Sequence, residues 1–345
     1  MKSGNRYPWL LLGGLAAASA GLVLVVRRWI LRRRRRIEQV LPPASEDQIR
    51  TQRIVDSMTD EVIQAFGFPI DGWQHQVLGP LLSPAARSFA GMLTSLDRYT
   101  GTEGLGAAFG RLLRLFVSDI QAVGAEKIPP TGPVMIITNH PGAYDGPSIA
   151  ASLPREDLHI VISTVPFFDE MSHVESHLIQ VTREAHDGMR GVRQSIRHLK
   201  SGGALLTFAS GIVDPDPDVL PGAHEALEDW SPSIGVILRR VPETQVVVTI
   251  VSGVLSPRWL TSPIVKIQPE TWRQRKLAEI LQVMHQVIFP GSLLLTPRIS
   301  FASPITAAEL SPDGDAREIQ RQLIERAQAL LVEHMAWSST SSMVS

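Results

Sequence analysis

Between residues 133 and 254 the sequence alternates short apolar runs with amphipathic stretches. The apolar runs are rich in β-branched side chains and read PVMIIT, LHIVISTV, HLIQVT, ALLTFAS and TQVVVTIVSG. Runs of this kind are typical of buried strands, and the helix-period segments between them are typical of covering helices. The alternation therefore predicts an α/β sheet flanked by helices, with functional residues in the loops at the strand ends.

Helical patterns precede and follow this region. Before it, QIRTQRIVDSMTDEVIQAF and LGAAFGRLLRLFVSDIQAVG place apolar residues at spacings of three and four, so residues 46–126 are predicted to be helical. After it, two long helices enclose a strand, PRISFASPI. The predicted organisation is a basic-flanked anchor over 1–36, a helical region over 37–127 for which membrane contact is one interpretation, an α/β domain over 128–337 and a loose tail over 338–345.

The N-terminus carries a candidate membrane span. Residues 8–26 form 19 consecutive positions without a charge, and RRWILRRRRR follows directly. A bilayer core needs roughly 20 apolar residues, and arginines placed just behind the run are retained on the cytoplasmic side. We therefore expect a single-pass membrane protein whose main domain faces the cytoplasm. A cleaved signal peptide, with AAASA as its cleavage site, and a helix lying on the membrane surface are the alternatives.

Composition excludes several functional classes. The chain has no cysteine, so disulfides, thiolate zinc sites and a cysteine nucleophile are excluded. Residues 1–36 contain nine basic residues and no acidic one, whereas the chain as a whole has a formal net charge of −1. A basic end on an acidic body indicates an anchor on an anionic lipid surface, and no nucleic-acid partner is expected.

The segment TNHPGAYDGPS follows the first apolar run of the predicted sheet. It places His140 directly after the strand and Asp145 five residues later. Five residues on an ideal helix turn through about 140°, so the two side chains meet only if His140 lies before the helix and Asp145 in its first turn. In that arrangement the carboxylate fixes the imidazole tautomer and leaves the other ring nitrogen free to take a proton from a hydroxyl. The alternative is that Asn139 caps a helix and Asp145 complements its dipole.

Three blocks of the sequence carry a family resemblance. NHPGAYDG after PVMIIT resembles the Asn-His-x-x-x-x-Asp block of the glycerolphosphate and lysophospholipid acyltransferase superfamily. LIQVTREAHDGMRGVRQSIRHLKSGGALLTFASG is similar to that family's next two blocks in order and spacing, and PRISFASPI is similar to its late strand. The resemblance covers roughly residues 128–331. It implies a mixed, largely parallel sheet flanked by helices.

The resemblance also implies an activity. A fatty acyl group would pass from acyl-CoA or acyl carrier protein to a hydroxyl of a glycerolipid or related lipid, without a metal, a cofactor or a covalent enzyme intermediate. His140 would be the general base and Asp145 the group that orients it. The residues that the family's blocks place at the substrate are Asn139, Arg183, Phe208, Ser210 and Gly211.

The chain departs from the family at the acceptor-binding block. The family's Phe-Pro-Glu-Gly-Thr-Arg, whose glutamate and arginine help to bind a phosphorylated acceptor, reads FASGIV at residues 208–213. Ser210 and Val213 thus replace both charges, and Thr249 stands near the place of an expected proline. The acceptor is therefore left open between phosphorylated lipids and uncharged alcohols, glycolipids or amino lipids. A lipid-binding protein with the acyltransferase fold and altered or lost activity is the alternative function.

Other candidate sites are weaker. DPDPD at 214–218 has alternating carboxylates, but it lacks the glycine and distal glutamate of a calcium loop, so a solvated acidic turn is expected. HVESH at 173–177 has two histidines at helical spacing in an order that differs from the zinc-protease motif. Ser210 lacks the Gly-x-Ser-x-Gly context of a serine hydrolase.

Overall fold

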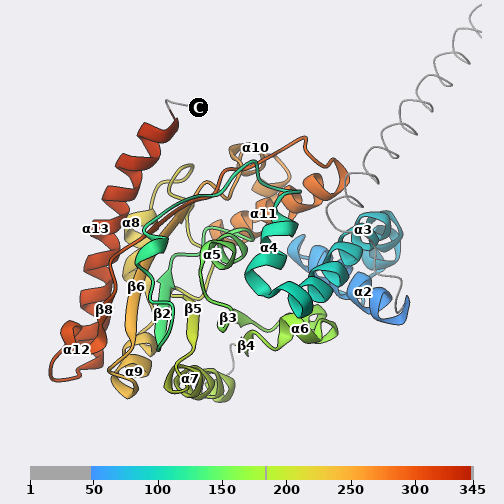
Figure 1. The fold of residues 1–345 in the computed structure, drawn as a ribbon. Helices are drawn as coiled ribbons and strands as arrows, with labels where there is room; N and C mark the ends of the chain where they lie inside the picture. The colour runs from blue at the N-terminus through green and yellow to red at the C-terminus, as the bar shows by residue number, and fades with distance from the viewer. Residues whose placement is uncertain (1–47, 183–184, 343–345) are drawn as a thin grey trace, which may run out of the picture.

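The structure is a computed structural model that describes residues 48–182 and 185–342 (Figure 1). Within these residues eight strands form one sheet, and helices cover both of its faces. The strands are β1 Gln121–Val123, β2 Val134–Thr138, β3 Leu158–Ser163, β4 Leu178–Val181, β5 Ala204–Phe208, β6 Gln245–Ser252, β7 Arg298–Phe301 and β8 Ile305–Thr306. The α-helices are α2 Gln48–Ala65, α3 Trp73–Glu103, α4 Leu105–Leu113, α5 Asp145–Ser152, α6 Ser172–Glu175, α7 Ala185–Lys200, α8 Ala223–Ala226, α9 Ser233–Arg240, α10 Pro257–Leu260, α11 Thr271–Ile288, α12 Ala307–Leu310 and α13 Ala316–Ser342.

The sheet is mixed and largely parallel, as the sequence predicts. Its strand order is β1-β7-β6-β2-β5-β3-β4, and β8 pairs with β6 outside this order. The central strand β2 pairs in parallel with β5 and with β6, while β7 and β8 run antiparallel to β6. Because parallel strands end at the same edge, the carboxyl ends of β2, β5 and β6 lie together, which is where α/β sheets place their ligands.

Strand β2 separates two apolar cores. Its residues alternate in direction, so Val134 and Ile136 enter the core that contains α3, α4 and α5, whereas Met135 and Ile137 enter the core that contains α7, α9 and α13. All four side chains are fully buried. In Figure 1, α12 and α13 lie to the left of the sheet, α9 lies below it, and α2, α3 and α4 lie to the right. The loop that follows β2 is therefore held from both faces.

The first edge of the sheet differs from the sequence-based expectation. The predicted helical region extended to residue 126, but α4 ends at Leu113 and residues 121–123 form β1. The Gln121 N–H donates to the Pro297 carbonyl (2.9 Å), and β1 then pairs in parallel with β7. The partner strand β7 lies far along the chain, so the local spacing of apolar residues does not reveal that residues 121–123 form a strand.

The C-terminal region also differs from expectation. A loose tail was predicted from residue 338, but α13 continues to Ser342. The Ser338 hydroxyl donates to Asp218 Oδ1 (2.9 Å), which attaches this last part of the helix to the loop before α8.

None of the helices within the described residues is both long and apolar enough to cross a bilayer. The predicted membrane span over 8–26 and the arginines behind it lie outside the described residues.

Candidate active site

His140 and Asp145 meet in the loop between β2 and α5. The Nδ1 atom of His140 lies 2.8 Å from Oδ2 of Asp145. His140 precedes the helix and Asp145 is its first residue, which is the arrangement that the five-residue spacing requires. The same carboxylate accepts the backbone N–H groups of Gly142 (3.1 Å) and Gly146 (2.5 Å). Asp145 is buried, so these bonds fix the carboxylate against the ring.

The His140 side chain is partly open to solvent. Its side chain is 26% exposed, and Nε2 makes no hydrogen bond to any residue that the structure describes. The Phe208 ring at the end of β5 packs on His140, with 4.4 Å between ring centroids and an interplanar angle of 37°. Nε2 is therefore the ring atom available for proton exchange with a bound hydroxyl.

Charges around His140 favour its protonated form. Burial lowers the pKa of the ring, but the Asp145 carboxylate, followed by Glu279 and Asp214, raises the pKa of His140 to about 9. The proton is therefore held by the ring at neutral pH, and the fraction of neutral base increases as the pH rises.

The acidic turn at 214–218 supports this loop, and the prediction that it is solvated is wrong. Asp214 Oδ2 accepts the His140 backbone N–H (2.8 Å), and the Asp214 N–H donates to the His140 carbonyl (2.7 Å). Asp216 accepts the three consecutive N–H groups of residues 253–255 at 3.0, 2.8 and 2.9 Å. Both carboxylates are buried. Backbone N–H groups after a strand need acceptors, and alternate residues of an extended chain face the same way to supply them.

Asn139 joins two strands of the sheet. Its Nδ2 donates to the Val251 carbonyl (2.9 Å), and its Oδ1 accepts the Val251 N–H (2.8 Å). It does not cap α5, whose N-cap residue is Tyr144. A substrate-binding role for Asn139 stays a prediction, and its buried amide already bonds to β6.

The other predicted substrate-binding residues lie near the end of β5, with one exception. Phe208 ends the strand, and the Ala209 N–H donates to the Thr138 carbonyl at the end of β2 (3.0 Å). The Ser210 hydroxyl donates to the Ile212 carbonyl (3.0 Å), and Gly211 has a φ of 69°, which favours glycine. Arg183 lies outside the described residues. Substrate contacts of these residues remain predictions.

Helix α11 contributes a row of polar residues that sequence reasoning missed. Gln282 accepts the Ser256 N–H (2.7 Å), and Gln286 accepts the Tyr144 hydroxyl (2.7 Å). Glu279 approaches Gly142 in the His140 loop, and burial raises the pKa of Glu279 to about 7. Their signal was a polar stripe at helical spacing within an amphipathic helix, formed by Arg275, Glu279, Gln282 and Gln286.

Two other histidine arrangements are structural. His334 on α13 is fully buried, with Nδ1 2.8 Å from the Ser300 hydroxyl and Nε2 2.8 Å from the Ser252 hydroxyl. Burial lowers the pKa of His334 to about 4, so the ring is a neutral link between α13 and the sheet. In the HVESH segment, the backbone N–H of His173 donates to Asp97 Oδ1 (2.8 Å).

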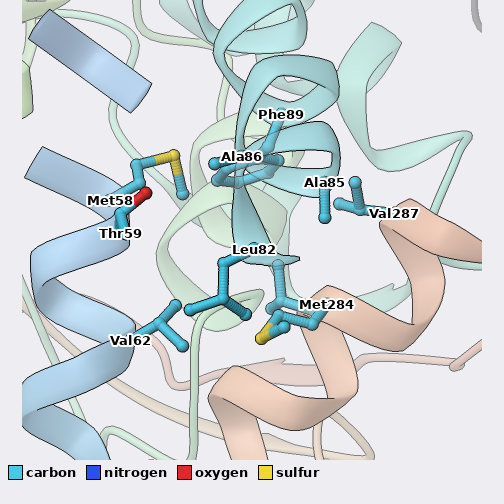
Figure 2. A pocket seen from close by; sticks show the side chains of 10 residues that line it. Met58, Thr59, Val62, Leu82, Ala85, Ala86, Phe89, Met284 and Val287 are labelled. Atoms are coloured by element: carbon cyan, nitrogen blue, oxygen red, sulfur yellow. The ribbon is translucent and has the colours of Figure 1, made fainter. Parts of the chain in front are cut away.

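An apolar cavity lies between α2, α3 and α11 (Figure 2). Its volume of about 40 Å³ holds only a few water-sized groups, which is too small for a fatty acyl chain. None of the candidate site residues lines it. The lining residues are Met58, Thr59, Val62, Leu82, Ala85, Ala86, Phe89, Val283, Met284 and Val287.

Comparisons with known proteins found a family match and a structural match. Residues 119–229 match the sequence profile of a family described as Acyltransferase. No curated protein matches the chain. Among solved structures, the chain is similar to the 1-acyl-sn-glycerophosphate (LPA) acyltransferase PlsC from Thermotoga maritima, with 15% identity and a TM-score of 0.41, over 84% of this chain and 98% of that chain.

Proposed function

We propose that the chain, whose residues 119–229 match the acyltransferase family profile, moves a fatty acyl group from an acyl thioester to a lipid hydroxyl. The observation that carries the proposal is the contact between His140 Nδ1 and Asp145 at the carboxyl edge of the sheet, which leaves Nε2 without a partner among the described residues of a side chain that is 26% exposed. A general base needs this combination of a fixed tautomer and an accessible second nitrogen.

The proposed reaction is a direct transfer. In the neutral form of His140, Nε2 takes the proton of the acceptor hydroxyl as the hydroxyl oxygen attacks the thioester carbonyl. The tetrahedral intermediate then expels the thiolate, and His140 returns the proton to the sulfur. The products are an ester and a free thiol, and no acyl group is attached to the protein. Asp145 stabilises the ring while it carries the charge.

The substrates are proposed on the same basis. The donor is acyl-CoA or acyl carrier protein, and the acceptor is a glycerolipid or related lipid alcohol. Ser210 and Val213 leave the loop after β5 without the two charges of the family's block, so acceptor charge has to be recognised elsewhere or not at all.

Membrane association is part of the proposal. Besides the predicted span over 8–26, three residues of α3 form an apolar stripe at four-residue spacing: Trp73, Val77 and Leu81 are 70%, 54% and 73% exposed. Gln268 Nε2 donates to the Ala65 carbonyl (3.1 Å), so the segment with exposed Ile264 and Ile267 lies next to the end of α2. Exposed apolar patches of this kind are typical of membrane contact sites.

One experiment tests the catalytic proposal. Membranes that contain the full chain are incubated with labelled acyl-CoA and total lipid, and the product is identified by mass spectrometry. We expect a labelled ester, and we expect His140→Ala to abolish it while the protein stays folded. Undiminished turnover by that variant would remove His140 as the base. If wild-type protein forms no product from any acceptor, the alternative function, a lipid-binding protein with the acyltransferase fold, is favoured instead.

A further inference from the structure

Three basic residues lie near the start of α11, and two of them have acidic partners. Arg273 Nε lies 3.0 Å from Glu270, and Lys276 Nζ lies 3.6 Å from Glu61. Arg275 is half-buried, and its Nε atom is buried without a hydrogen-bond partner in the described part of the chain. A guanidinium carries five N–H donors, and donors that are removed from water normally bond to an acceptor. The Nε donor of Arg275 is unsatisfied, and an anion would supply its acceptor.

The surroundings of Arg275 indicate which anion this is. Arg275 lies within electrostatic range of Asp214, whose Oδ2 accepts the His140 backbone N–H. Arg275 forms no ion pair among the described residues. The Asp214 carboxylate therefore does not bond directly to the guanidinium of Arg275. Asp214 follows Val213, the position at which the family's block has an arginine. Helix α11 thus brings a cation to the loop that lost one.

Along α11, Arg275 comes between the exposed Trp272 and Glu279, which approaches the His140 loop. The exposed residues Ile267 and Trp272 come shortly before it in the chain, and Glu279, one helical turn after it, faces the His140 loop. A lipid that enters from the apolar surface with its hydroxyl at His140 would carry a headgroup past Arg275. Burial and planarity make arginine well suited to hold a phosphate through two parallel hydrogen bonds.

We infer that Arg275 is the phosphate-binding residue of the acyl-transfer site and replaces, from α11, the charge missing at Val213. The inference rests on the proposed function in one respect, which is that the phosphate belongs to a substrate. Two substrates offer the same chemistry: a phosphorylated lipid acceptor such as a lysophosphatidic acid, and the phosphates of acyl-CoA.

Binding is tested first without turnover. The full chain in detergent is unfolded thermally at increasing inorganic phosphate, together with Arg275→Gln and the matched control Arg273→Gln on the same helix. We expect phosphate to raise the unfolding temperature of wild type and of Arg273→Gln, and to have little effect on Arg275→Gln. An equal rise in all three proteins would overturn the assignment. This result stands even if no acyl transfer is found.

Kinetics then identify the source of the phosphate. We expect Arg275→Gln to raise a KM by roughly 10- to 100-fold, the loss typical of a charge-assisted contact, and Arg275→Lys to recover part of it. A rise confined to lysophosphatidic acid, with monoacylglycerol unaffected, assigns the phosphate to the acceptor. A rise for acyl-CoA, but not for an acyl N-acetylcysteamine thioester, assigns it to the donor. An equal fall in kcat with every substrate pair would contradict the inference, because it would mean that Arg275 acts only through Asp214 on His140.

Discussion

A Cβ atom added to Gly146 would lie 3.1 Å from Cζ of Phe208, the ring that packs on His140. The glycine at the second position of α5 therefore lets the aromatic ring that packs on His140 lie close to the start of the helix. Helix stability does not explain the glycine at this position, because alanine within a helix is normally more stable than glycine by up to about 1 kcal/mol.

Gly146→Ala is expected to reduce activity more than stability. The new methyl group displaces the Phe208 ring, which packs on His140, by a few tenths of an ångström, and misplacement of this order lowers kcat by roughly three- to tenfold. Unfolding free energy should change by less than about 1 kcal/mol, because the gain in helix propensity offsets the contact. Gly91→Ala on α3 is the matched control, since its Cβ would meet no atom within 4 Å. Unchanged kcat in Gly146→Ala would mean that Phe208 does not position the base.

The pH dependence of kcat/KM should report the raised pKa of His140. The neutral ring is the base, so activity increases as pH rises toward the pKa of about 9 and levels off above it. Glu279→Gln removes a negative charge near the ring and should move the rising limb of the pH profile to lower pH. Asp145→Asn should move it further and also lower the maximum rate by at least roughly 100-fold, because the tautomer is no longer fixed. A limb near pH 6.5 that neither substitution moves would contradict this account of the site.

His334 should make the fold sensitive to mild acid. The pKa of His334 is about 4 in the folded protein against 6.5 ordinarily, so between these values the unfolded chain binds a proton that the native state does not. Stability is therefore lost as the pH falls through this window, by about 2 kcal/mol between about pH 7 and about pH 4.5.

The measurement is denaturant unfolding at both pH values. His334→Gln should lose about 2 kcal/mol less than wild type over this interval, whatever its stability at neutral pH. His224→Gln, a change at an exposed histidine on α8, should behave like wild type. The assignment is wrong if both variants show the wild-type loss.

The apolar stripe of α3 should matter only at a lipid surface. Val77→Glu combined with Leu81→Glu places two charges on Trp73's side of the helix, which opposes insertion into the interface. We expect a fall in activity toward acceptors in vesicles and no change toward a water-soluble short-chain acceptor. Val332→Glu on α13, also exposed, is the control for an added surface charge. Equal losses with both kinds of acceptor would indicate a folding defect instead of lost membrane contact.

The parts of the site that could be predicted are those that depend on short stretches of chain. His140 and Asp145 are five residues apart and follow a strand with a clear apolar pattern, so local geometry permits their contact and the family resemblance predicts it. The mixed sheet was expected from the same runs and from the family resemblance.

The remaining parts depend on contacts between distant segments. Asp214 and Asp216 look like a solvated acidic turn until β2 and β6 bring unpaired backbone N–H groups against them. Arg275 and Glu279 look like ordinary polar residues of an amphipathic helix until the fold brings α11 next to the His140 loop. Strand β1 likewise exists only because β7 is there to pair with it.

Two buried carboxylates, Asp214 and Asp216, attach the far end of the loop after β5 to neighbouring segments. Asp214 secures the loop to the catalytic turn and Asp216 secures it to the end of β6, while Ala209 bonds to β2 at the other end. Between these attachments, the Ser210 side chain interacts with Asp214, whose carboxylate accepts the His140 backbone N–H. A substitution at Ser210 therefore acts in two places at once, on the loop after β5 and, through Asp214, on the backbone that carries His140.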